Sequence, residues 1–102
     1  MTEYVSLGSI VFLNGGIQKV LVISRAINVR RGDQTFFFDY AGVPYPEGLI
    51  SDRVAYFNNE DIAKVVFEGY RDSDDEMMVN NINQYLNDNP NITKGSAEAF
   101  KD

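Results

Sequence analysis

Apolar residues form short blocks, separated by turn-forming residues, through the first 70 positions of the chain. Residues 9–13 are an apolar run rich in β-branched side chains that ends at Asn14-Gly15-Gly16, and residues 19–28 form a longer apolar run. The Asn-Gly-Gly turn supplies residues that tolerate positive φ, so it predicts a hairpin between two paired strands. Because the second run is apolar on both faces at its centre, we expect a central strand that curls around a core.

A third strand is predicted at residues 35–40, where aromatic side chains dominate. In residues 41–53, Pro44 and Pro46 flank Tyr45 and restrict the backbone to extended conformations. We therefore expect this segment to be a stiff connecting arm. Short strands are predicted at residues 54–57 and 63–70, with a brief helical segment that begins at Asn58 or Asn59 between them.

The pattern becomes helical after residue 72. Ser73 and Glu76 fit a capping box in which Ser73 is the N-cap. A helix over residues 74–87 would place four apolar side chains on one face, and we expect that face to dock on the sheet. These side chains are Met78, Ile82, Tyr85 and Leu86.

Together these elements predict a mainly β (α+β) fold. Five strands within residues 4–70 form an SH3-like meander or a partly open barrel, followed by one C-terminal amphipathic helix. An open sheet packed on a helix is the alternative. We expect one compact domain over residues 1–88 and a polar, flexible tail over residues 89–102, because 102 residues suit a single core.

Composition narrows the possible function classes. The chain has no Cys, His or Trp, which excludes nucleophile–histidine catalysis and metal sites built on imidazole or thiolate. No glycine arrangement matches a phosphate-binding motif. The net charge of −6 lies entirely in residues 51–102, since residues 1–50 carry four basic and four acidic side chains. We therefore expect no cofactor, no metal and no nucleic-acid partner.

With these residue types absent, carboxylates are the main side chains left that could bind a metal ion or act as acid and base. Asp72, Asp74, Asp75 and Glu76 are suitable calcium ligands by type, but they lack the spacing of a calcium loop, and a helix cap accounts for them. Asp39 and Glu47 could act as acid and base only if the fold brings them together. A small-molecule binder or enzyme that uses these carboxylates under the arm is therefore an alternative class.

The stiff arm is the candidate binding surface, because rigid aromatic anchors lose little entropy on binding. The alternative is that Tyr40, Val43 and Tyr45 cover the hydrophobic core. The candidate partner-binding residues are Asp39, Tyr40, Val43, Pro44, Tyr45, Pro46, Glu47, Tyr56 and Phe57.

The sequence shows no export or membrane signal. Glu3 stands where a secretory signal would carry a basic residue, and no apolar stretch approaches the roughly 20 residues that span a bilayer. We therefore expect a cytoplasmic protein without membrane insertion.

Four segments carry a resemblance to a known family: residues 7–16, 38–48, 56–62 and 66–70, with YPEG and FEGY as the most specific parts. In this order and spacing they resemble the bacterial domain of unknown function 4176. Members of that family are usually encoded beside polymorphic LXG toxins, which Gram-positive bacteria export by type VII secretion. The resemblance implies a cytoplasmic adaptor or chaperone whose partner is a toxin or a secretion component. The alternative is an immunity protein of the toxin cluster, and a homo-oligomer is compatible with either role.

Overall fold

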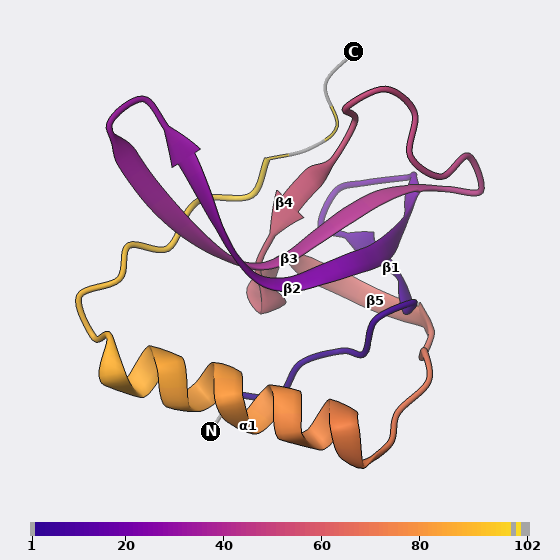
Figure 1. Cartoon of the computed structure of the whole chain (residues 1–102). Helices are drawn as coiled ribbons and strands as arrows, with labels where there is room; N and C mark the ends of the chain where they lie inside the picture. The colour runs from indigo at the N-terminus through magenta and orange to yellow at the C-terminus, as the bar shows by residue number, and fades with distance from the viewer. Residues whose placement is uncertain (1, 99, 101–102) are drawn as a thin grey trace.

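The computed structural model describes residues 2–98 and residue 100. In this part of the chain, five antiparallel strands form one sheet in the order β4-β3-β2-β1-β5 (Figure 1). A single turn of 3-10 helix, η1 (Asn59–Asp61), joins β4 to β5, and the helix α1 (Ser73–Asp88) follows the sheet. The strands are β1 (Ile10–Leu13), β2 (Lys19–Arg31), β3 (Gln34–Tyr45), β4 (Ala55–Phe57) and β5 (Ile62–Phe67). This arrangement confirms the mainly β class, and the sheet is open, with β4 and β5 at its edges.

Strand β3 extends further than the sequence pattern predicts. Its pairing with β2 runs from Gln34 to Tyr45, so the prediction that residues 41–45 are a connecting arm is wrong. Pro44 is tolerated because β4 pairs with β3 only as far as Gly42, which leaves no strand on that side of Pro44. Its carbonyl oxygen accepts a hydrogen bond from Gly48 N at 2.7 Å.

The two sheet edges differ in how they are protected. Strand β5 pairs with β1 through two register shifts, which bend and twist an edge strand. At the other edge, Tyr56 of β4 exchanges both backbone hydrogen bonds with Glu98, at 3.0 and 2.7 Å. Residues 93–98, which we expect from the sequence to belong to a polar tail, therefore lie against β3 and β4.

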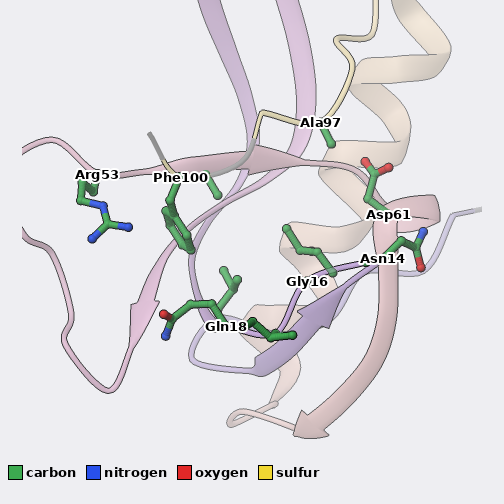
Figure 2. A pocket seen from close by; sticks show the side chains of 12 residues that line it. Asn14, Gly16, Gln18, Arg53, Asp61, Ala97 and Phe100 are labelled. Atoms are coloured by element: carbon green, nitrogen blue, oxygen red, sulfur yellow. The ribbon is translucent and has the colours of Figure 1, made fainter. Parts of the chain in front are cut away.

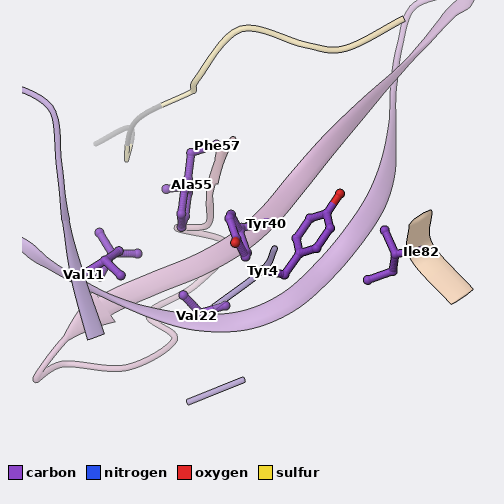
Figure 3. Close-up of a cluster of buried hydrophobic side chains, with 8 residues drawn as sticks. Tyr4, Val11, Val22, Tyr40, Ala55, Phe57 and Ile82 are labelled. Atoms are coloured by element: carbon purple, nitrogen blue, oxygen red, sulfur yellow. The ribbon is translucent and has the colours of Figure 1, made fainter. Parts of the chain in front are cut away.

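The core gathers side chains from β1, β2, β3 and β4 together with Tyr4 and with Ile82 of α1 (Figure 3). Tyr40 stacks on Phe57 at 5.3 Å between ring centroids and meets Tyr4 edge-on at 5.8 Å. The buried cluster comprises Tyr4, Val11, Val20, Val22, Tyr40, Ala55, Phe57 and Ile82.

Helix α1 contacts this core along a narrow line. Ile82 is buried, and Val79 and Leu86 pack beside it. The predicted docking is confirmed for Ile82, Leu86 and Tyr85, whose ring stacks on Phe37 of β3 at 6.4 Å between centroids, whereas Met78 is 41% exposed. Residues three and four positions apart share a face, so Val79, Ile82 and Leu86 lie along one side of the helix.

The helix is capped one residue earlier than predicted. Asp72, not Ser73, is the N-cap, and its side chain accepts a hydrogen bond from Asp75 N. Arg25 and Arg71 hold the Asp75 side chain at 2.8 and 2.7 Å, which fixes the start of the helix. Among the described residues, no helix has the length and apolar character needed to cross a membrane.

Candidate functional site

Five of the nine candidate binding residues lie in the protein interior. Asp39, Tyr40, Val43 and Phe57 are between 0 and 3% exposed, and Pro44 is fully buried. These side chains cannot contact a partner while the protein is folded. For Tyr40 and Val43, the structure therefore supports the alternative interpretation, in which they belong to the core.

Asp39 joins three separate parts of the chain. Its carboxylate accepts hydrogen bonds from Asn59 N at 2.9 Å, from Lys94 Nζ at 3.1 Å and from the Tyr4 hydroxyl at 3.3 Å. Its backbone N–H donates to Asn58 Oδ1 at 2.9 Å. These bonds fasten η1, the N-terminal segment and residues 93–98 to β3, so they give Asp39 a structural role. Asp39 is buried whereas Glu47 is exposed, so the two carboxylates do not face one solvent-filled site.

The buried tyrosines beside Asp39 are held neutral. Burial raises the pKa of Tyr40 to about 12, and burial together with the Asp39 carboxylate raises the pKa of Tyr4 further. The Tyr40 hydroxyl donates to Asn59 Oδ1 at 2.5 Å and accepts from Val5 N at 2.9 Å. Both phenols are therefore hydrogen-bonding groups of the core rather than bases at neutral pH.

The other candidates lie nearer the surface. Tyr45 is 39% exposed, and Pro46 and Glu47 are exposed beside it at the end of β3. Tyr56 is half-buried and lies in the strand that Glu98 covers. The structure thus separates the nine residues into a buried group, a covered tyrosine and an exposed group at Tyr45–Pro46–Glu47.

Gln18 links the exposed group to the turn between β1 and β2. Its side-chain amide donates to Tyr45 O at 2.6 Å and approaches Glu47 Oε1 at 3.5 Å. The Lys19 ammonium lies 5.9 Å from the centroid of the Tyr45 ring. The end of β3 and the β1–β2 turn therefore form one continuous surface.

A recess of about 490 Å³, here called the hairpin pocket, opens beside this surface (Figure 2). Leu13, Val20 and Ala55 contribute apolar walls. Figure 2 shows Arg53 and Phe100 at one side and Asn14 and Asp61 at the opposite side.

Sequence reasoning missed this pocket because its walls come from distant segments. One local signal was available: Ile17, an apolar residue directly after a polar turn, lines the pocket and is 98% exposed. The prolines on both sides of Tyr45 favoured Tyr45, rather than Ile17, as the candidate binding residue.

A second recess, here called the apolar groove, has a volume of about 470 Å³ and lies between β2 and the beginning of α1. Leu7, Ile23, Tyr70 and Met78 line it, and each of them is more than 40% exposed. Among the described residues, no group of three or more acidic side chains is arranged to hold a metal ion. The acids at the groove, Asp72, Asp74 and Asp75, therefore form no metal centre in the described part of the chain.

Comparison with known proteins places the chain in one family. No curated protein and no solved structure shows significant similarity to it. The family model described as Domain of unknown function (DUF4176) matches residues 4–78, which include all five strands and the first turns of α1. Residues 93–98 lie outside the match. Since the match covers most of the chain, this protein belongs to the DUF4176 family.

Proposed function

We propose that this protein is a cytoplasmic binding partner, an adaptor or chaperone, for a toxin exported by type VII secretion. One observation carries the proposal: the hairpin pocket opens beside two exposed anchors, Ile17 and Tyr45, which are 98 and 39% exposed. Large apolar side chains that stay exposed next to a recess are typical of protein interaction sites.

The shape of this surface favours a protein partner over a small molecule. A small-molecule site buries most of its ligand inside a cavity, whereas here the apolar surface continues from the pocket onto Ile17 at the turn. A partner side chain can enter the pocket while its neighbours contact Ile17 and Tyr45. The toxin setting rests on the resemblance of the YPEG and FEGY segments.

The chemistry of the interior supports binding rather than catalysis. The carboxylate of Asp39 is occupied by donors from Asn59, Lys94 and Tyr4. The raised pKa values of Tyr4 and Tyr40 keep both phenols protonated. These three buried groups therefore serve to hold the fold together.

The test is co-purification of the full chain with the toxin encoded beside it, followed by affinity measurement. We expect Tyr45→Ala to weaken binding by about 2 kcal/mol, roughly 30-fold, if the ring is a hot-spot anchor. Tyr85→Ala is a matched control, because Tyr85 is 41% exposed and lies on α1 outside the pocket. The control should bind as the wild type does.

Two outcomes would contradict the proposal. If the wild-type chain binds no product of its own gene cluster, the accessory role is wrong. If its expression protects cells that make the toxin internally but leaves toxin export unchanged, the protein is an immunity factor instead.

A further inference from the structure

We infer that the apolar groove binds an amphipathic helix of a partner protein, with Lys or Arg residues beside the apolar face of that helix. The inference rests on the proposed binding function and adds a second surface and the chemistry of its occupant. The groove is separate from the hairpin pocket, because the two share no lining residue.

The walls of the groove are apolar and open to solvent. Leu7 and Ile23 are 49 and 46% exposed, and Tyr70 and Met78 are 80 and 41% exposed. A contiguous apolar surface of this kind marks an interaction site, and methionine adapts its shape to different partner side chains. The walls therefore suit a row of apolar side chains better than a polar ligand.

The floor of the groove is preformed. The side chains of Arg25 and Asp75 are only 4 and 9% exposed and form an ion pair at 2.8 Å between β2 and α1. Arg71 also holds Asp75, at 2.7 Å, and donates to Tyr4 O at 2.7 Å. These contacts fix the strand and the helix relative to each other. Binding of a partner would therefore not require the loss of conformational entropy that ordering the site would bring.

The charge around the groove selects a basic partner. Its lining includes one basic side chain, Arg25, and three acidic ones, Asp72, Asp74 and Asp75, a net charge of −2. Arg25 and Arg71 neutralise Asp75, whereas among the described residues neither Asp72 nor Asp74 has an ion-pair partner. Lys or Arg residues on a bound segment would complement these two carboxylates.

A helix fits this site better than an extended strand does. Strand addition needs a regular, free sheet edge, but Glu98 already pairs with β4, and two register shifts distort β5. The groove lies instead between β2 and α1, and it is lined by Ser24 and Arg25 of β2 and by Asp74 and Asp75 in the first turn of the helix. Such a trough accepts apolar side chains at helical spacing, as in helix-in-groove recognition.

The experiment measures binding of labelled peptides to the full chain by fluorescence anisotropy. The probe is a helical peptide of about 18 residues, with Leu on one face and Lys on the other. Two controls are a peptide with Glu in place of Lys and a scrambled Leu/Lys peptide of identical composition. We expect the Leu/Lys helix to bind at least 10-fold more tightly than either control.

Variants of the protein locate the binding surface. Tyr70→Ser should weaken Leu/Lys peptide binding at least 10-fold, and Asp74→Asn should weaken it several-fold at low salt. Ile50→Ser is the matched control, because Ile50 is 43% exposed and lines neither recess, and it should bind as the wild type does. Equal binding of the scrambled peptide, or full binding by Tyr70→Ser, would overturn the inference.

The same variants separate this inference from the proposed function. If wild type and Tyr70→Ser capture the neighbouring toxin equally and bind the peptide equally, the groove inference fails while the accessory role stands. If the wild type binds the Leu/Lys helix through Tyr70 but does not bind the toxin, the groove inference stands and the accessory role fails.

Discussion

Gly95 provides a test of how the segment 93–98 is held on the sheet. A Cβ atom at position 95 would lie 2.3, 2.7 and 2.8 Å from three atoms of the Phe38 ring. Non-bonded carbon atoms normally approach to about 3.5–4.0 Å, so Gly95→Ala requires a shift of about 1 Å. Phe38 is 1% exposed and packs against Tyr56 at 5.5 Å, so its ring has little room to move. We therefore expect the segment, rather than the ring, to move.

The size of the effect follows from the contacts that such a movement breaks. Gly95 N donates to Phe37 O at 2.9 Å, Asn58 Nδ2 donates to Gly95 O at 2.8 Å, and Phe37 N donates to Thr93 O at 2.7 Å. Each hydrogen bond contributes about 1 kcal/mol net. The freed backbone regains some conformational entropy, so we expect Gly95→Ala to lower the free energy of unfolding by about 1–3 kcal/mol.

The assay combines urea unfolding with amide hydrogen exchange. The amide of Tyr56 donates to Glu98 O at 3.0 Å, so its exchange should accelerate at least 10-fold in Gly95→Ala. Ser96→Ala is the control, because Ser96 is exposed in the same segment and should change neither quantity. Wild-type stability together with wild-type Tyr56 exchange in Gly95→Ala would refute the reasoning.

Three further changes probe the core. Ile82→Ala should lower the free energy of unfolding by about 2–4 kcal/mol in urea, because Ile82 is the buried anchor of α1; a loss below about 1 kcal/mol would show that the helix is not held there. Asp75→Ala should cost about 3–5 kcal/mol by the same assay, since it leaves Arg25 buried without its carboxylate; a neutral result would contradict the preformed groove floor. Raising the pH above 10 should destabilise the protein, because Tyr40, with its pKa raised to about 12, stays protonated in the folded state while it ionises in the unfolded state. Urea midpoints should therefore fall between pH 10 and 12 from their value near pH 8, and a midpoint that does not fall would contradict the burial of the phenol.

The sequence by itself determined the elements whose signals are local. Neighbouring residues alone predict the turn at Asn14-Gly15-Gly16, the succession of strands and the α-helix. The α-helix is observed at Ser73–Asp88. Turn chemistry and side-chain periodicity act within a few residues, so they can be interpreted without knowledge of the fold. The cap is Asp72 rather than Ser73, and both residue types are favoured N-caps, so the local sequence alone did not separate them.

Only the tertiary structure decided which surfaces are free. The prolines indicated an extended backbone around Tyr45, but they could not show that Lys19 of β2 pairs with it. The polar composition of residues 89–102 indicated a tail, yet Lys94 reaches buried Asp39, 55 positions earlier. The apolar groove likewise joins Leu7 to Met78. Burial and recesses arise where segments distant in sequence meet, and no local pattern records which segments those are.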